Sequence, residues 1–256
     1  MRPLFGGEGR RAVTGLLTHR RVLLGFDFDG TLAPIVARPD DARMPLPVAR
    51  RMAALARRWP VAVITGRSVA DVAARLSFEP TFVLGNHGLE VAGSEPTPHM
   101  QRSAAVIAPV RHALQREVPD LAAAGVTIED KGYSLALHYR LATDPARARA
   151  AVDRALADLP PQVLASPGKL VVNVVAADAP DKGDGMLALV ERAGAESALF
   201  VGDDLNDEPV FAKAPSHWVT VRIGRDHLLS RAAFYVDGTG QLPALLDLLQ
   251  GAAGPA

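Results

Sequence analysis

Four short apolar runs, separated by amphipathic helical patterns, constrain most strongly what this chain can fold into. They are residues 22–26, 61–64, 81–84 and 198–201. Each run has four or five residues and is bounded by polar or glycine positions, which is typical of a strand buried on both faces. Apolar residues at helical spacing follow Pro47, Ser68 and Gly185, and a last helical face lies within 242–249. This alternation predicts an α/β fold with a parallel sheet covered on both faces.

The middle of the chain has a different pattern. Its strand-like segments are 126–128, 133–139 and 170–175. Its helical segments are 103–117 and 144–159. Along 133–140 apolar and polar side chains alternate, which is typical of an antiparallel sheet with one covered and one open face. We therefore expect a small α+β domain inserted into the parallel-sheet core. The expected core domain comprises 1–99 and 177–256, and the expected cap domain comprises 100–176.

The composition excludes several functional classes. The 256 residues include no cysteine, so disulfides, cysteine-based zinc sites and thiolate nucleophiles are impossible. The 28 basic and 28 acidic residues give zero net charge, whereas dedicated binders of nucleic acids or anionic membranes carry a basic surplus. Glycines and arginines interrupt every N-terminal apolar stretch, and no run is long enough to span a bilayer. We expect a cytoplasmic monomer without nucleic-acid or membrane partners.

Side chains suited to catalysis follow the predicted strands. Asp27 and Asp29, in the sequence Asp-Phe-Asp-Gly-Thr-Leu, come directly after the first strand, and Thr65 follows the second. The acidic segment 203–207 follows the last strand, and Lys182 precedes a helix. Each of these residues alone is compatible with a helix cap, a turn or a solvated surface. Together, at the sheet edge where ligands bind, they supply the carboxylates, hydroxyl and ammonium that phosphoryl transfer requires.

These four segments resemble the motifs of the haloacid dehalogenase superfamily of Mg²⁺-dependent phosphatases. Further segments are similar to trehalose-6-phosphate phosphatases, namely 29–35, 85–90, 134–140, 168–169 and 202–208. The resemblance implies a Rossmann-like parallel-sheet core with an inserted α+β cap, in agreement with the pattern of strands and helices. It also implies Mg²⁺ as the cofactor and a small sugar phosphate as the partner.

The resemblance further implies a role for each core residue. Asp27 and Asp203 would ligate the metal through carboxylates, and Asp29 through its backbone carbonyl, which leaves its side chain free. Asp207, or alternatively Asp204, would join the metal site or position Lys182. Asp27 would be the nucleophile and Asp29 the general acid and base. Thr65 and Lys182 would hold the phosphate oxygens.

Residues expected to bind substrate come from both domains: Gly66, Arg67, Asn86, His87, Glu90, His138, Arg140, Lys169 and Asn173. His138 and Arg140 are expected to share one strand face, and Lys169 and Asn173 are expected to share a face of the next strand. Two alternatives stay open: His87 could be a loop residue that bonds backbone, and the face with His138 and Arg140 could be merely solvated. Asn173 stands where the family usually has glutamate, and Val175-Ala176 replace an Arg-Pro pair. An amide accepts hydrogen bonds less strongly than a carboxylate, so this departure bears on which sugar is bound.

The function expected from these features is hydrolysis of trehalose 6-phosphate through an aspartyl-phosphate. A phosphatase for another sugar phosphate and a sugar phosphomutase remain open alternatives. A halide-releasing hydrolase fits less well, because Asp29 and the 203–207 loop indicate a proton donor and a metal. A non-catalytic sugar-phosphate sensor is the remaining alternative.

Overall fold

The computed structural model describes residues 1–226 and 229–251, and positions 227, 228 and 252–256 of the expected core domain lie outside these residues. The chain forms two compact units. Residues 1–92 and the part that follows 179 form the first, which we call the core unit. Residues 93–179 form the second, which we call the cap unit.

The core unit is built on an eight-stranded sheet with the order β1-β12-β11-β10-β2-β3-β4-β5. The strands are β1 (Arg2–Pro3), β2 (Val22–Phe26), β3 (Val61–Ile64), β4 (Phe82–Gly85), β5 (Glu90–Val91), β10 (Ser197–Gly202), β11 (Val219–Ile223) and β12 (Phe234–Val236). Only β5 is antiparallel to its neighbour among these strands. This arrangement confirms the α/β prediction, and β2 and β10 lie side by side at its centre.

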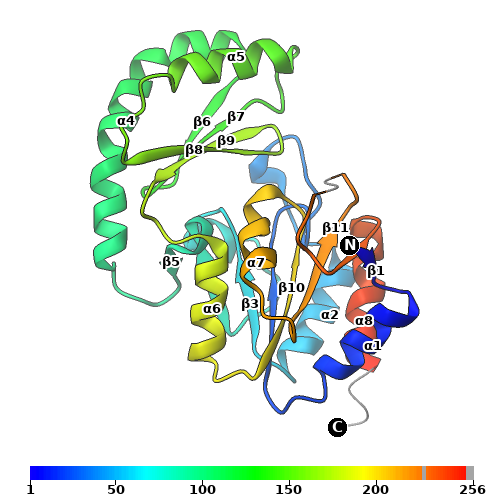
Figure 1. The fold of residues 1–256 in the computed structure, drawn as a ribbon. Coiled ribbons are helices and arrows are strands. Elements are labelled where there is room, and N and C mark those ends of the chain that lie inside the picture. The colour runs from blue at the N-terminus through cyan, green and yellow to red at the C-terminus, as the bar shows by residue number, and fades with distance from the viewer. Residues whose placement is uncertain (227–228, 252–256) are drawn as a thin grey trace. The chain divides into compact units, whose positions relative to one another are not determined.

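Helices cover both faces of this sheet, because alternate residues of the central strands point in opposite directions. The helices of the core unit are α1 (Gly7–Leu16), α2 (Leu46–Ala56), α3 (Val69–Ala73), α6 (Lys182–Arg192), α7 (Glu208–Lys213) and α8 (Leu242–Gly251). Leu24 and Phe26 pack in one apolar cluster with α1, α2 and α8. Leu23 belongs to the opposite cluster, with α6 and α7. The helices of the core unit are labelled in Figure 1. Short 3₁₀ turns follow several strands: η1 (Pro39–Asp41), η2 (Asn86–Gly88), η3 (Leu205–Asp207) and η4 (Thr239–Gln241).

The cap unit has a four-stranded antiparallel sheet with the order β6-β7-β9-β8. Its elements are α4 (Pro98–Ala123), β6 (Thr127–Asp130), β7 (Leu135–His138), α5 (Pro145–Ala155), β8 (Val163–Gly168) and β9 (Val171–Ala176). Leu135 and Leu137 face an apolar cluster shared with α4 and α5, as the alternation along 133–140 predicted. The separate antiparallel sheet confirms the expected α+β character of the insertion.

Two features of the cap unit differ from the prediction. Strand β8 was missed because it contains Pro167, which cannot donate a ladder hydrogen bond and is accommodated because β8 is an edge strand. Lys169 was expected on a strand face with Asn173, but it lies in the turn between β8 and β9, beside Leu170 at φ +58°.

In the described part of the chain, no helix combines the length and apolarity needed to cross a bilayer.

Candidate active site

Parallel pairing brings the ends of β10, β2 and β3 to one edge of the core sheet. Val201 pairs with Phe26, and Phe26 pairs with Val63. The N–H of Asp27 donates to the carbonyl of Val201 over 2.9 Å, which fixes Asp27 beside the end of β10. The residues that follow these three strands, as the sequence predicted, therefore emerge next to one another.

Three carboxylates and one ammonium form a buried cluster at this edge. Asp27, Asp203 and Asp207 each place a carboxylate oxygen within 4.8 Å of the others. Lys182, in the first turn of α6, donates to Asp27 Oδ1 and to Asp207 Oδ1, both over 2.7 Å. Its side chain is only 1% exposed. Lys182 and Asp27, which are 155 positions apart in the sequence, thus belong to one polar site inside an apolar core.

Asp207 organises the loop as well as the lysine. Its Oδ2 accepts the backbone N–H groups of Asp203 and Asp204, over 2.8 and 3.0 Å. The Oδ1 of Asp204 instead accepts the N–H of Leu205. Asp207, and not Asp204, is therefore the second acidic member of this loop in the cluster with Asp27.

Burial dominates the electrostatics of the cluster. Desolvation raises the pKa of Asp27 well above its ordinary value, and the charges of Asp207 and Asp203 raise it further, against the opposing effect of Lys182. For Lys182, burial disfavours the ammonium, but Asp207 and Asp27 outweigh burial and raise its pKa. The lysine therefore stays charged, and this single ammonium does not neutralise the three carboxylates when all of them are ionised.

The donor set of this cluster suits a hard divalent cation. Carboxylate oxygens are the ligands that Mg²⁺ and Ca²⁺ prefer, and three of them converge here. Gly30 supplies space, because a Cβ at this position would overlap the carboxylate of Asp203. Its φ of +82° also lies in the left-handed region that favours glycine. Asp27, Asp203 and Asp207 are thus the residues that could hold such an ion.

The end of β3 is followed by Thr65, which has a hydroxyl group, and by Gly66, which has no side chain. Thr65 is fully buried, and its Oγ1 accepts the N–H of Arg67 over 3.2 Å. A Cβ at Gly66 would meet the ring of His87, so glycine permits the close approach of that ring. His87 is anchored by its N–H to the carbonyl of Thr65 and has φ +60°, which is unusual for a residue with a side chain. The structure thus brings Thr65, Gly66 and His87 together.

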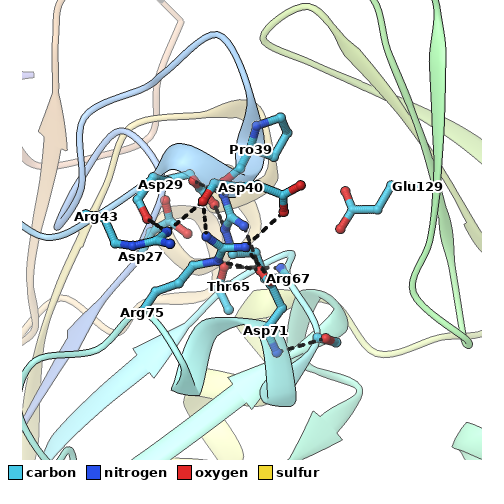
Figure 2. Close-up of polar contacts among 12 residues, drawn as sticks. Asp27, Asp29, Pro39, Asp40, Arg43, Thr65, Arg67, Asp71, Arg75 and Glu129 are labelled. Atoms are coloured by element: carbon cyan, nitrogen blue, oxygen red, sulfur yellow. Dashed lines mark hydrogen bonds and ion pairs between the residues drawn. The ribbon is translucent and has the colours of Figure 1, made fainter.

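Asp29 has a partner that the sequence did not predict. Arg67 donates from Nε to Asp29 Oδ2 over 2.7 Å and from Nη2 to Oδ1 over 2.8 Å (Figure 2). The expectation that Asp29 ligates a metal through its backbone carbonyl, and not through its side chain, stays a prediction. The separation of 38 positions along the chain hides the pairing with Arg67 from sequence patterns.

Asn86 and Glu90 bond to each other. Asn86 Nδ2 donates to Glu90 Oε2 over 2.9 Å, and the same oxygen accepts the N–H of Val69 at the start of α3, also over 2.9 Å. These contacts brace the helix that follows Arg67. A direct contact of Asn86, His87 or Glu90 with substrate stays a prediction.

One face of the cap sheet carries a polar group that the sequence reading found only in part. His138 Nε2 lies 2.7 Å from Glu129 Oε2, and Lys131 Nζ lies 3.8 Å from the same oxygen. Asn173 is on this face, because it pairs with Ala136, which pairs in turn with Glu129. Glu129 and Lys131 were missed because the predicted strand ended at residue 128, whereas β6 continues to Asp130 and Lys131 directly follows it.

Arg140 and Lys169 bond to each other in the cap unit. Arg140 Nη2 donates to the carbonyl of Lys169 over 3.0 Å, so the arginine braces the turn in which that lysine lies. Roles for both residues in substrate binding stay predictions.

Comparisons with known proteins agree on one family. The family model for trehalose-phosphatase matches residues 25–227. The chain is 35% identical over 217 residues to a trehalose-phosphate phosphatase of Mycolicibacterium paratuberculosis, which covers 80% of this chain and 55% of that protein. It is 34% identical over 210 residues to an uncharacterized glycosyl hydrolase of Mycobacterium tuberculosis, covering 77% of this chain and 15% of that protein. The chain thus spans about half, or less, of the length of these relatives.

The fold is also similar to a solved structure, the C-terminal domain of trehalose-6-phosphate phosphatase from C. albicans. The TM-score is 0.83 at 21% identity, with 98% of this chain and 99% of that chain covered. At this identity the likeness concerns the fold alone. The family model and the sequence identities establish the relationship, and the chain therefore belongs to the trehalose-phosphatase family.

Proposed function

We propose that this protein is a Mg²⁺-dependent phosphatase that hydrolyses trehalose 6-phosphate to trehalose and phosphate. The observation that carries the proposal is the buried cluster in which Lys182 bridges Asp27 and Asp207 beside Asp203. Phosphoryl transfer consists mainly of positioning and charge stabilisation, and this cluster supplies a nucleophile, a fixed cation and metal ligands. Membership of the trehalose-phosphatase family supports the choice of reaction.

The core residues divide the chemistry between them. Mg²⁺, when bound by Asp27, Asp203 and Asp207, would offset the negative charge of the phosphate. A carboxylate oxygen of Asp27 attacks phosphorus, the bond to the sugar oxygen breaks, and that oxygen takes a proton from Asp29. Water then attacks the aspartyl-phosphate and gives a proton to Asp29, and the released phosphate leaves Asp27 as a free carboxylate. Lys182 and the hydroxyl of Thr65 stabilise the phosphate oxygens throughout.

The cap unit is proposed to select the sugar. A sugar offers many hydroxyl groups, so its site needs fixed charged and amide groups. The face with Glu129, Lys131, His138 and Asn173 provides both kinds of group on adjacent strands. The similarity to a trehalose-phosphate phosphatase supports trehalose 6-phosphate as the proposed substrate.

A panel of sugar phosphates tests the proposal. Phosphate release is measured for trehalose 6-phosphate, glucose 6-phosphate, sucrose 6-phosphate and a glyceryl-sugar phosphate, with Mg²⁺ and with a chelator. We expect Mg²⁺-dependent release that is fastest from trehalose 6-phosphate. Asp27→Asn should remove it without altering the circular dichroism spectrum.

Each alternative gives a different outcome in this panel. A strong preference for another ester would replace the substrate but keep the reaction. Isomerisation that depends on a bisphosphate would indicate a phosphomutase. Tight binding without turnover would indicate a sensor, and release by Asp27→Asn would exclude that residue as the nucleophile.

A further inference from the structure

We propose that Arg67 is a positioning residue that holds the carboxylate of Asp29 ready for proton transfer to the leaving sugar oxygen, and that Asp71 and Arg75 hold Arg67 in turn. The inference rests on the proposed function, because it assigns a task within that reaction. It differs from the sequence-based expectation, in which Arg67 binds substrate.

The contact between Arg67 and Asp29 is a two-point fork. Nε and Nη2 of the guanidinium reach the two oxygens of Asp29 over 2.7 and 2.8 Å. The Asp29 side chain is 40% exposed, whereas that of Arg67 is 7% exposed. An exposed aspartate on its own samples several rotamers, so the buried guanidinium is the rigid partner of this pair. One fork bond can persist while the other oxygen carries a proton, so the fork keeps Asp29 oriented in both halves of the reaction.

The guanidinium of Arg67 is itself fixed on several sides. Nη1 donates to Asp71 Oδ2 over 2.6 Å, and Nη2 also donates to the carbonyl of Pro39 over 2.9 Å. The ring of Phe28 lies beneath it, with 5.6 Å from Cζ to the ring centroid. Of the five N–H groups of an arginine side chain, four are thus directed to this protein's own acceptors. This saturation favours a residue that orients Asp29 over one that binds a sugar.

A second arginine closes the network on its outer side. Arg75 donates from Nε and Nη2 to the two oxygens of Asp71, over 3.0 and 2.5 Å. It also reaches the carbonyl of Asp40 over 2.7 Å and the carboxylate of Asp40 over 3.1 Å (Figure 2). The fork is therefore connected to three segments of the core unit: the end of β2, helix α3 and turn η1. Loss of Asp71 would leave Arg67 with one carboxylate partner and weaken its hold on Asp29.

The dependence of the rate on the leaving group separates positioning from mere stabilisation of the fold. A sugar alkoxide is a poor leaving group and needs the proton from Asp29, whereas p-nitrophenolate leaves without one. The ratio kcat/KM reports the steps up to formation of the aspartyl-phosphate. A damaged proton donor should therefore lower kcat/KM for the sugar phosphate far more than for p-nitrophenyl phosphate. A general loss of structure would lower both equally.

The test compares Arg67→Lys, Asp71→Asn and the control Arg43→Met on both substrates, with the best sugar ester of the panel. Lysine keeps the charge but cannot form the fork. Arg43 lies in the same loop region, but among the described residues its side chain donates to the carbonyls of Asp40 and Ala42 and not to Asp29. Thermal unfolding of each variant verifies that it is folded.

We expect Arg67→Lys to lose about 10- to 100-fold in kcat/KM for the sugar phosphate, within the contribution of a general acid, and less than about 3-fold for p-nitrophenyl phosphate. Asp71→Asn should show a smaller loss with the same selectivity, and Arg43→Met no selectivity. Equal losses on both substrates, or a rise in KM alone for the sugar ester, would overturn the inference and leave the proposed function standing. If the unaltered protein hydrolyses neither ester, the proposed function fails, and the inference fails with it.

Discussion

The lysine that bridges two buried carboxylates offers the most direct test of the site's electrostatics. In Lys182→Met the ammonium is replaced by an uncharged side chain of similar length, and Asp27 and Asp207 lose their shared partner. Two charge-assisted hydrogen bonds of 2.7 Å are removed, each of which contributes about 1.5–3 kcal/mol. Breaking a buried ion pair costs about 3–5 kcal/mol, so both routes indicate a loss of about 4 kcal/mol in the free energy of unfolding.

A loss of this size is easily measured. For a domain of this size, 1 kcal/mol shifts Tm by about 2–4 °C, so Tm should fall by about 8–16 °C in metal-free buffer. Because Lys182→Met leaves three carboxylates without their cation, MgCl₂ should raise the Tm of the variant more than that of the unaltered protein. Differential scanning calorimetry with and without MgCl₂ measures both effects.

Lys213 provides a matched control. It also bonds two carboxylates, those of Asp181 and Asp184, over 2.9 and 2.6 Å, but its side chain is 36% exposed. Exposed pairs contribute about 0–1 kcal/mol each, so the loss of both pairs in Lys213→Met should lower Tm by less than about 8 °C. Equal losses in Lys182→Met and Lys213→Met would refute the argument that burial makes the Lys182 contacts strong.

Three further perturbations have defined outcomes. Gly202→Ala should abolish phosphate release in a colorimetric assay, because a Cβ there would overlap the carboxylate of Asp207, and retained turnover would contradict the tight packing of that loop. Burial raises the pKa of Asp71, but hydrogen bonds, first of all from Arg75, lower it below its ordinary value. The resulting stabilisation is full above the pKa of the unfolded chain, about 3.9, and disappears as the pH falls through the folded pKa. Urea unfolding from about pH 7 to pH 3 should therefore show a steeper acid loss in the unaltered protein than in Asp71→Asn, and parallel curves would refute this. Asn173→Glu should shift the preference among sugar phosphates, and an unchanged profile in the panel would exclude a role in reading the sugar.

The sequence predicted the core better than the cap because the core strands are buried on both faces. Strands 22–26 and 61–64 were predicted with the bounds that the structure has, since a continuous apolar run defines both ends. Helix α4 is longer than the predicted 103–117, which ran through Pro109 but ended two residues before Pro119. The residues Ile107, Val110, Leu114 and Leu121 bury one face of α4, and this packing outweighs the local cost of the prolines.

The candidate site shows the same division between local and distant information. Asp27, Thr65, Lys182 and Asp203 could be placed at strand or helix ends because their neighbours in the sequence define those ends. The fork between Asp29 and Arg67 could not be predicted in this way. These two side chains are 38 positions apart, and only the course of the loops brings them into contact. No periodicity in the sequence encodes that path.

The pairing of β2 with β10 has a consequence for how the protein is made. All residues from 93 to 179 lie between these two neighbours in the sheet, so a ribosome releases β2, β3 and β4 and then the entire cap unit before β10 emerges. Until then one edge of β2, whose five residues are all buried in the finished protein, lacks its partner strand. Such late closure between distant segments slows folding and leaves nascent chains prone to aggregate. Because Asp27 precedes the insertion and Lys182 and Asp203 follow it, the acidic cluster is completed only after the whole cap unit has been synthesised, and chains terminated within the cap unit are released without it.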